Sequence, residues 1–315
     1  MASPAISLPR SIPRNYRLNL QTLFLSLLAG AVCLLVLAPL IWIIFSSFIL
    51  SKPWEPLVYG LGGWREAFTT PGIVRSIYNT FALAVTRQLI ALALGIVLAW
   101  VLARTDIPMK GELEFMFWLS FFMPALPITM GWILAFDPKV GVINLWFAKL
   151  PFIGHTVFNI YSFWGIVWAH LTTTTLGVQV MLLTPAFRNM DSALEEASRS
   201  SGAGTWTTLR RIIVPVMAPA ILVTTILGLI RALEAFEIEL ILGFRVGITV
   251  YSTEIYSMIE YDPFGGIAPA SALSSFFLSI LLILVVLNRV YIGRRQYTTV
   301  SGRYSNRAAS LGHWR

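Results

Sequence analysis

The sequence is poor in charge, in cysteine and in histidine. Only 12% of its 315 residues are charged, whereas a soluble domain carries about 25%. The single cysteine, Cys33, excludes an internal disulfide, and the three histidines lack metal-ligand spacing, so no metal site is predicted. Hydrophobic residues make up 57% of the chain, which is more than a soluble core can bury. A membrane protein is therefore predicted.

The sequence also lacks the motifs of common hydrolytic sites. It contains no G-x-x-x-x-G-K-[ST] phosphate loop, no H-E-x-x-H zinc motif and no G-x-S-x-G nucleophile motif. The chain is therefore not expected to be an enzyme, and neither a catalytic residue nor a cofactor of its own is predicted. Its net charge of +8 forms no basic stripe with stacking aromatics, so no nucleic-acid partner is predicted.

Six hydrophobic segments are long enough to cross a bilayer, which takes about 20 helical residues. They are expected at residues 20–50, 79–103, 115–136, 161–184, 217–243 and 270–292. The first is too long for a cleavable signal peptide. The prediction is an all-α membrane protein with one domain over 20–292, flanked by tails at 1–19 and 293–315.

The distribution of lysine and arginine predicts the orientation of these helices. Fifteen of these residues fall on the side that holds both termini, and six fall on the opposite side. Positively charged residues are retained on the cytoplasmic side of short loops. Both termini and the loop 185–215 are therefore expected in the cytoplasm.

The loop 185–215 is much longer than a simple connection between helices requires. Asp191 can cap a short helix, Gly202 and Gly204 allow a turn with positive φ, and an amphipathic segment follows from Trp206. This pattern predicts a helix–turn–helix projection. A helix lying on the lipid surface, anchored by Trp206, fits the same periodicity.

This loop resembles the EAA loop of the permease subunits of bacterial binding-protein-dependent ABC importers. The family pattern is Glu-Ala-Ala, three residues, Gly, nine residues, Ile, one residue and Leu-Pro. Every spacing is matched here, by Glu196, Ala197, Ser198, Gly202, Ile212, Val214 and Pro215. Ser198 replaces an alanine and Val214 replaces a leucine. The resemblance implies the type I importer permease fold, with six transmembrane helices.

The resemblance also implies a mechanical role. In this family a short coupling helix sits in a cleft of a separate cytoplasmic ATPase, and ATP-driven closure of two ATPases switches the permease between inward-open and outward-open. Glu195 and Glu196 are expected at this contact, where Glu196 would pair with a basic group of the ATPase. Ala197 and Ala203 would allow close approach, and Gly202 would form the turn.

Several partners follow from the resemblance. They are a cytoplasmic ABC ATPase dimer that uses ATP, a second permease half, a periplasmic or lipid-anchored substrate-binding protein, and membrane lipid. The second half could be identical, different or fused to this chain. The tail from Thr298 to Arg315 resembles the linker of fused iron-type permeases, so the chain could be the first half of such a fusion.

The expected substrate also comes from resemblance. The sequences ALEAFEIELILG, from Ala232 to Gly243, and VYSTEIYSMI resemble the branch that moves ferric iron, thiamine or polyamines. Ferric iron is the expected substrate within this branch. An ATP-independent channel and a membrane-embedded enzyme are the alternatives from other classes. The channel leaves the EAA pattern unexplained, and the enzyme lacks a convergent set of reactive groups.

Four charged residues fall inside the expected fifth helix, namely Arg231, Glu234, Glu237 and Glu239. Each would cost about 2.5–3.5 kcal/mol facing lipid near the bilayer centre, so these side chains must face protein or water. The first three share a broad helical face, which permits an internal ion pair and a lining of the translocation path. The alternative is a place at the membrane edge or a pairing with Arg87 of the second helix.

Overall fold

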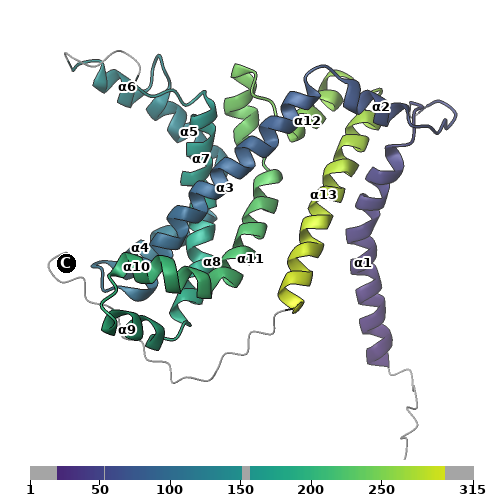
Figure 1. Cartoon of the computed structure of the whole chain (residues 1–315). Helices are drawn as coiled ribbons and strands as arrows, with labels where there is room; N and C mark the ends of the chain where they lie inside the picture. Colours follow the sequence, from purple (N-terminus) through teal and green to yellow (C-terminus); the bar gives the residue numbers. More distant parts are fainter. Residues whose placement is uncertain (1–19, 53, 151–156, 295–315) are drawn as a thin grey trace, which may run out of the picture.

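The computed structural model describes residues 20–52, 54–150 and 157–294, which fold into helices joined by short connections (Figure 1). In chain order these are α1 (Leu20–Ser46), α2 (Gly62–Thr69), α3 (Ile73–Arg104), α4 (Lys110–Phe122), α5 (Ala125–Phe136), α6 (Val142–Phe147), α7 (Phe163–His170), η1 (Leu171–Thr175), α8 (Leu176–Arg188), α9 (Ala193–Ser200), α10 (Thr205–Thr208), η2 (Leu209–Ile213), α11 (Val214–Leu233), η3 (Glu239–Gly243), η4 (Phe244–Val246), α12 (Tyr251–Tyr261) and α13 (Ile267–Arg294). The expected tails, 1–19 and all but the first two residues of 293–315, lie outside the described residues.

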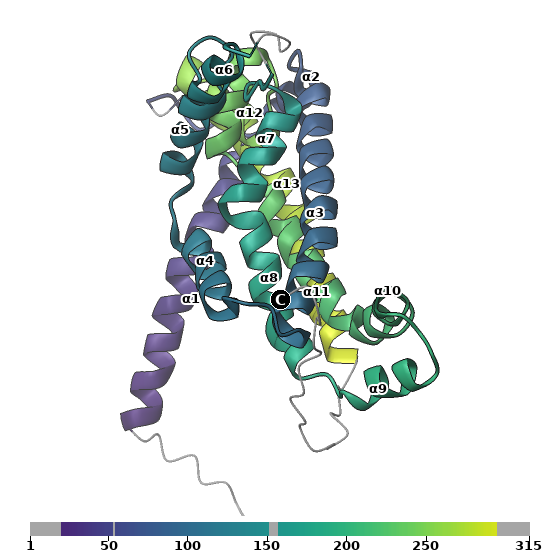
Figure 2. The same cartoon turned by 90° about the vertical axis from the view of Figure 1, so that its left-hand side faces the viewer.

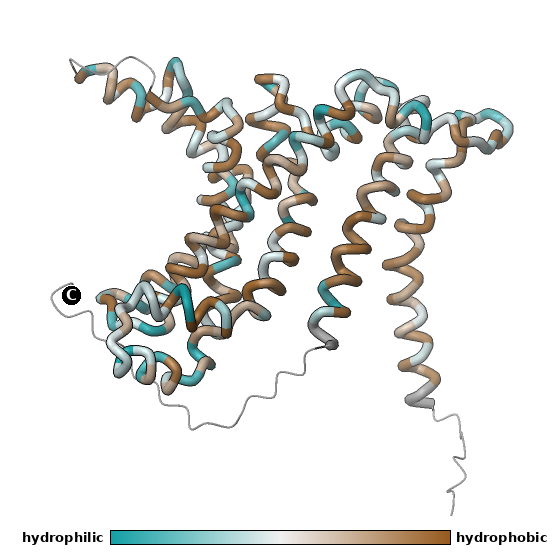
Figure 3. The backbone as a smooth tube through the Cα atoms, viewed as in Figure 1, coloured by the Kyte–Doolittle hydropathy of each residue, from teal (hydrophilic) through white to brown (hydrophobic). Residues whose placement is uncertain are grey.

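Among the residues that the structure describes, five helical stretches are long and apolar enough to cross a membrane. They are Leu23–Ser46, Ile73–Arg104, Phe163–Arg188, Thr205–Leu233 and Ile267–Tyr291. A sixth span is present if α4 and α5, which are bent by 104° at a short break, are taken together. Figure 3 shows hydrophobic residues along these helices and hydrophilic residues in the connections at both ends. The predicted all-α membrane architecture is confirmed, with the third span bent.

The bend in the third span has a local cause. Met123 and Pro124 have the extended backbone angles of −75°, 131° and −62°, 142°. Proline disfavours the helical conformation of the residue before it, so α4 ends at Phe122 and a new helix begins after Pro124. The sequence predicts one helix over 115–136, and this interruption replaces it with two.

The core of the bundle is built around α3, which packs along α8 and α11. Close approach to α8 depends on Gly95, since a Cβ there would lie 2.8 Å from Cβ of Gln179. At the end that carries α9, buried side chains of α3, α8, η2 and α11 form one cluster, which includes Trp100, Phe187 and Ile213. α1 is different, because its apolar stretch is unburied in this chain and it packs beside α13 (Figure 1).

The fifth span differs most from its prediction. The sequence predicts a helix over 217–243, whereas the helix runs from Thr205 to Leu233. Pro215 does not separate it from the preceding loop, because this proline lies in the first turn of α11, and the wider π-helical turn η2, which ends at Ile213, leads directly into α11. At the other end, residues 234–236 leave the helix. Glu239 then begins the separate helix η3.

Candidate functional site

α9 forms the first arm of the predicted helix–turn–helix projection. The N–H of Ala193, the first residue of the helix, donates to Oδ1 of Asp191 at 2.9 Å, although the N-cap position is Ser192, one residue later than the predicted cap. Glu195 and Glu196 lie in its first turn, where carboxylates favourably meet the positive end of the helix dipole. Figure 2 shows α9 and α10 projecting together from one end of the bundle.

A tight turn follows α9 at Gly202, which has a φ of +79°. Its N–H donates to the carbonyl oxygen of Arg199 at 2.9 Å, and the N–H of Ala203 donates to that of Ser198 at 3.1 Å. This is the usual left-handed ending of a helix at glycine. The predicted positive φ at Gly204 is wrong, because its φ is −70° and it enters α10 in an extended conformation.

Two buried contacts fix α9 against the bundle. Nε of Arg104, the last residue of α3, donates to Oε1 of Glu195 at 2.8 Å. Oγ of Ser198 lies 2.8 Å from Oγ1 of Thr208, which joins α9 to α10. Sequence reasoning missed Arg104 and Thr208 as partners. The sequence did contain one indication for Arg104: a charged residue at the end of an apolar helix often has an ionic partner.

The outer face of α9 is open to solvent or to a partner. Glu196 and Ala197 are exposed, and Leu194 is 41% exposed. Glu195, which the resemblance also places at the ATPase contact, points inward to Arg104 instead. A carboxylate, a small residue and an exposed leucine on one short helix can receive a closely packed partner.

The remaining residues of the EAA pattern lie at and after the turn. Ala203, Ile212 and Val214 are half-buried, and Pro215 is exposed. Ile212 lies within η2, and Val214 and Pro215 begin α11. The pattern therefore extends from the projecting helix into the fifth span itself, and only the tight turn at residues 201–204 separates the two.

The four charged residues of the expected fifth helix lie in two different surroundings. Nη1 of Arg231 is 3.4 Å from Oε2 of Glu234, and both side chains are exposed, the arginine by 83%. Glu237 is also exposed. Because the helix ends at Leu233, the predicted common face of Arg231, Glu234 and Glu237 does not form.

Glu239 is buried and belongs to a polar cluster. Its Oε1 lies 3.4 Å from Nη1 of Arg87 and accepts a hydrogen bond from Nε2 of His170 at 2.8 Å. Nη2 of Arg87 also donates to the carbonyl oxygen of Ala232. The pairing with Arg87 that the sequence left open as an alternative is thus present for Glu239.

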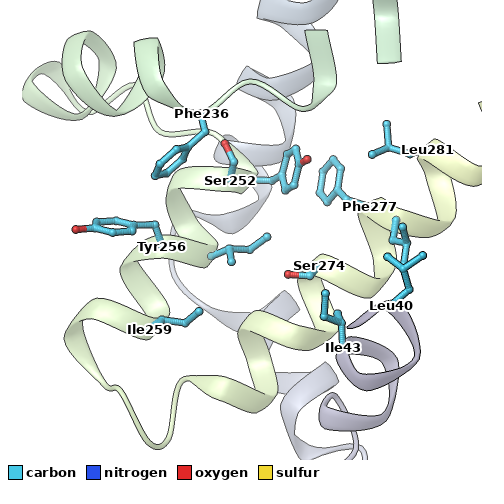
Figure 4. A pocket seen from close by; sticks show the side chains of 12 residues that line it. Leu40, Ile43, Phe236, Ser252, Tyr256, Ile259, Ser274, Phe277 and Leu281 are labelled. Carbon is cyan, nitrogen blue, oxygen red and sulfur yellow. The ribbon is translucent and has the colours of Figure 1, made fainter. Parts of the chain in front are cut away.

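An open pocket lies beside this break (Figure 4). It is lined by Leu40, Ile43, Phe236, Tyr251, Ser252, Ile255, Tyr256, Ile259, Ser274, Phe277, Leu278 and Leu281. Phe236 comes from the break itself, and the rings of Phe236 and Tyr256 are 5.7 Å apart. Burial, together with the negative charges of Glu234 and Glu239, raises the pKa of Tyr251 to about 12. The Tyr251 hydroxyl therefore stays neutral at physiological pH.

The helical spans, with a braced helical projection at one end, define the chain as a multi-span helical membrane protein. Its fold matches a crystal structure of a bacterial alginate ABC transporter in complex with an alginate pentasaccharide-bound periplasmic protein. The TM-score is 0.67 at 20% identity, over 87% of this chain and 94% of that one. The family of binding-protein-dependent transport system inner membrane components matches residues 91–293. The chain belongs to this family.

Two relatives of the chain are transport permeases named for different solutes. It is 28% identical over 239 residues to the probable sulfate transport system permease protein cysT of Zygnema circumcarinatum, covering 74% of this chain and 78% of that protein. It is 31% identical over 149 residues to the putative ferric transport system permease protein FbpB 1 of Haemophilus influenzae, covering 46% of this chain and 22% of that protein. The permease class predicted from the EAA loop is confirmed, whereas the iron branch is not singled out.

Proposed function

We propose that this chain forms half of the translocation pathway of an ABC importer and receives mechanical work from a separate ATPase through α9. The observation that carries the proposal is the way α9 is held. Its inner face is fixed by Arg104 and by Thr208, while Glu196 and Ala197 remain exposed on its outer face. When a partner bound to the outer face of such a helix moves, the helix passes that displacement on to the bundle to which its inner face is fixed.

The proposal includes the partners expected from the family. ATP is bound and hydrolysed by a cytoplasmic ATPase dimer, a second permease half completes the pathway, and a substrate-binding protein delivers the solute. Both termini and α9 then face the cytoplasm, in line with the excess of lysine and arginine on that side. Glu196 is placed to pair with a basic group of the ATPase at a partly desolvated contact.

Purification of the tagged chain from native membranes in a mild detergent tests this role. An ATP-hydrolysing subunit should co-purify with the chain, and substitution of the exposed Ala197 by tryptophan should reduce its recovery because the ring fills the contact. The substitution of Ser201, exposed on the same hairpin, by alanine serves as the control. Recovery of the chain alone in a form that transports without ATP would show that the role is wrong.

We infer that the solute is a small inorganic ion, with sulfate as the first candidate. The relatives named for sulfate transport support it, because they match about three quarters of the chain. Ferric iron is the second candidate. It is supported by the shorter match to a ferric permease and by the exposed carboxylates of Glu234 and Glu237. Uptake of labelled sulfate and of labelled ferric iron by cells with and without the gene distinguishes them.

The exposed pair of Arg231 and Glu234 gives a second, sharper test of the solute. Charged side chains are costly where they face lipid, so we place the pair, with Glu237, on the water-filled path beside the pocket. For an anion such as sulfate, Arg231→Gln should lower uptake about tenfold, because a charged cleft concentrates ions of opposite sign. Glu234→Gln should leave sulfate uptake undiminished, because it frees the arginine from its partner.

The opposite ranking of these two variants would favour ferric iron. Arg65→Gln, which changes an exposed arginine of α2, is the control and should leave uptake unchanged. If all three variants transport as the unmodified chain does, the pair does not line the path. Each uptake value is divided by the amount of assembled complex, so that a loss of expression is not read as a loss of transport.

A further inference from the structure

α3 makes a buried ionic contact at each of two functional regions. At the α9 end, Arg104 binds Glu195. Seventeen residues earlier, about 25 Å along the helix, Arg87 binds Glu239. α3 contains no proline and runs without interruption from Ile73 to Arg104. The two ion pairs are therefore joined by a single continuous helix (Figure 1).

Arg87 acts at the break in the fifth span. The last carbonyl groups of a helix need partners from outside it, and at membrane depth the protein must provide them. Nη2 of Arg87 donates to the carbonyl oxygen of Ala232, and Oγ of Ser252 in α12 donates to that of Ala235 at 2.7 Å. The break is thus held from one side by α3 and from the other by α12.

The charges of this cluster also match the helix ends that they touch. A cation is favourable at the C-terminal end of α11, where Arg87 lies, and a carboxylate is favourable at the start of η3, where Glu239 lies. His170, which binds Glu239, directly precedes the π-helical segment η1. The break after Leu233 and the π-helical segment η1 therefore meet at three polar side chains, those of Arg87, His170 and Glu239.

Beyond the break, α3 is hydrogen-bonded to the beginning of α12. Nδ2 of Asn79 donates to the carbonyl oxygen of Thr249 at 3.0 Å, and the N–H of Tyr251 donates to Oγ1 of Thr80 at 2.9 Å. α12 supplies one wall of the pocket in Figure 4, including Tyr256. A displacement of α3 would therefore carry that wall with it.

Stability alone does not account for the buried pair of Arg87 and Glu239. Replacing a buried ion pair by well-packed apolar side chains is often neutral or stabilising. In the part of the chain that the structure describes, Nε of Arg87 and Oε2 of Glu239 also have no hydrogen-bond partner. Buried polar atoms without a hydrogen-bond partner destabilise a core that keeps a single conformation. It leaves a donor and an acceptor available for new contacts if the break changes shape.

We propose that α3 transmits the movement of α9 to the pocket, with Arg104 as its contact at one end and Arg87, His170 and Glu239 as positioning residues at the break. This inference rests on the coupling role proposed above. It adds that the ATPase acts on the pocket wall through these two ion pairs of α3. Removing the pair at the break should then separate ATP hydrolysis from transport, although the ATPase still binds α9.

The test compares two double variants in proteoliposomes that contain the whole importer. Arg87→Met with Glu239→Met removes both charges at the break, so neither is left buried alone. Arg188→Met with Glu114→Met is the matched control, since this pair also joins two helices, α4 and α8, but lies outside the proposed connection. Three quantities are measured for each: the amount of bound ATPase, the rate of ATP hydrolysis and the rate of solute uptake.

For the Arg87 and Glu239 double variant we expect normal ATPase binding and hydrolysis but uptake reduced about tenfold, the scale of losing a charged buried hydrogen bond. The number of ATP molecules consumed per solute then rises by the same factor, while the control keeps its ratio. Unchanged uptake would overturn the proposal, as would an equal fall in hydrolysis and uptake or a loss of the assembled complex. Absence of a bound ATPase from the unmodified complex would instead refute the coupling role itself.

Discussion

Arg104→Leu should abolish transport and reduce the recovery of the bound ATPase, although Arg104 lies on the inner side of α9. The substitution leaves the carboxylate of Glu195 buried without its cation, which costs about 3–5 kcal/mol for a pair of this kind. Tilting α9 outward would return the carboxylate to water and relieve this cost. The outer face with Glu196 and Ala197 would then no longer be presented in the orientation that the ATPase contacts.

Two companion variants separate this effect from a general loss of stability. Arg188→Leu breaks the half-exposed ion pair with Glu114, which is worth about 1 kcal/mol or less, so transport should be nearly normal. Arg104→Leu combined with Glu195→Leu removes both buried charges and should recover assembly in the membrane. Measurements of co-purified ATPase and of uptake decide the matter, and normal values for Arg104→Leu alone would contradict the bracing role of this pair.

The helix–turn–helix shape of the hairpin formed by α9 and α10 could be predicted because its signals are local. Asp191, the acidic first turn of α9 and Gly202 lie within a dozen residues, and each acts on backbone groups beside it. The spacing of the motif residues from Glu196 to Pro215 also matches the family pattern, which supported the prediction of this hairpin. Local sequence therefore predicted the helix–turn–helix shape of the hairpin, whereas the contact expected at Glu196 came from the family resemblance.

The partners that hold the hairpin and the break could not be predicted in the same way. Arg104 and Glu195 are 91 residues apart, and Arg87 and Glu239 are 152 residues apart, so only tertiary packing brings them together. The sequence contains no local signal for the end of α11 either, because residues 234–236 include neither proline nor glycine. That helix ends where Arg87 and Ser252 satisfy its free carbonyl groups, and these donors come from other helices.

The same reasoning explains why the fifth-helix charges were predicted only in part. Their cost in lipid required protein or water around them, and the structure shows protein around Glu239. A common face for Arg231, Glu234 and Glu237 requires a regular helix through all three residues. Since the helix ends at Leu233, the continuous helical periodicity no longer applies beyond it. Glu239 consequently turns into the core, while Glu237 remains exposed.

Gly202→Val should also uncouple transport, and the reason is backbone conformation, not crowding. A Cβ at this position would meet nothing within 4 Å, but the φ of +79° lies in the left-handed region that β-branched residues avoid. The left-handed conformation costs an ordinary residue about 1–2 kcal/mol relative to glycine, and it costs valine more. We expect the turn to open and the contacts of α9 with Arg104 and Thr208 to weaken. Uptake and bound ATPase should then fall about tenfold or more.

Gly204→Val is the matched control for this prediction, because it adds the same side chain two residues later. Gly204 has a φ of −70° and a ψ of 160°, which valine adopts without strain, and a Cβ there would also meet nothing within 4 Å. Gly202→Asn should fall between the two, since asparagine tolerates the left-handed region better than valine. If Gly202→Val and Gly204→Val impair transport equally, side-chain bulk at the ATPase contact is responsible. If only Gly202→Val does, the positive φ of the turn holds α9 in its coupling position.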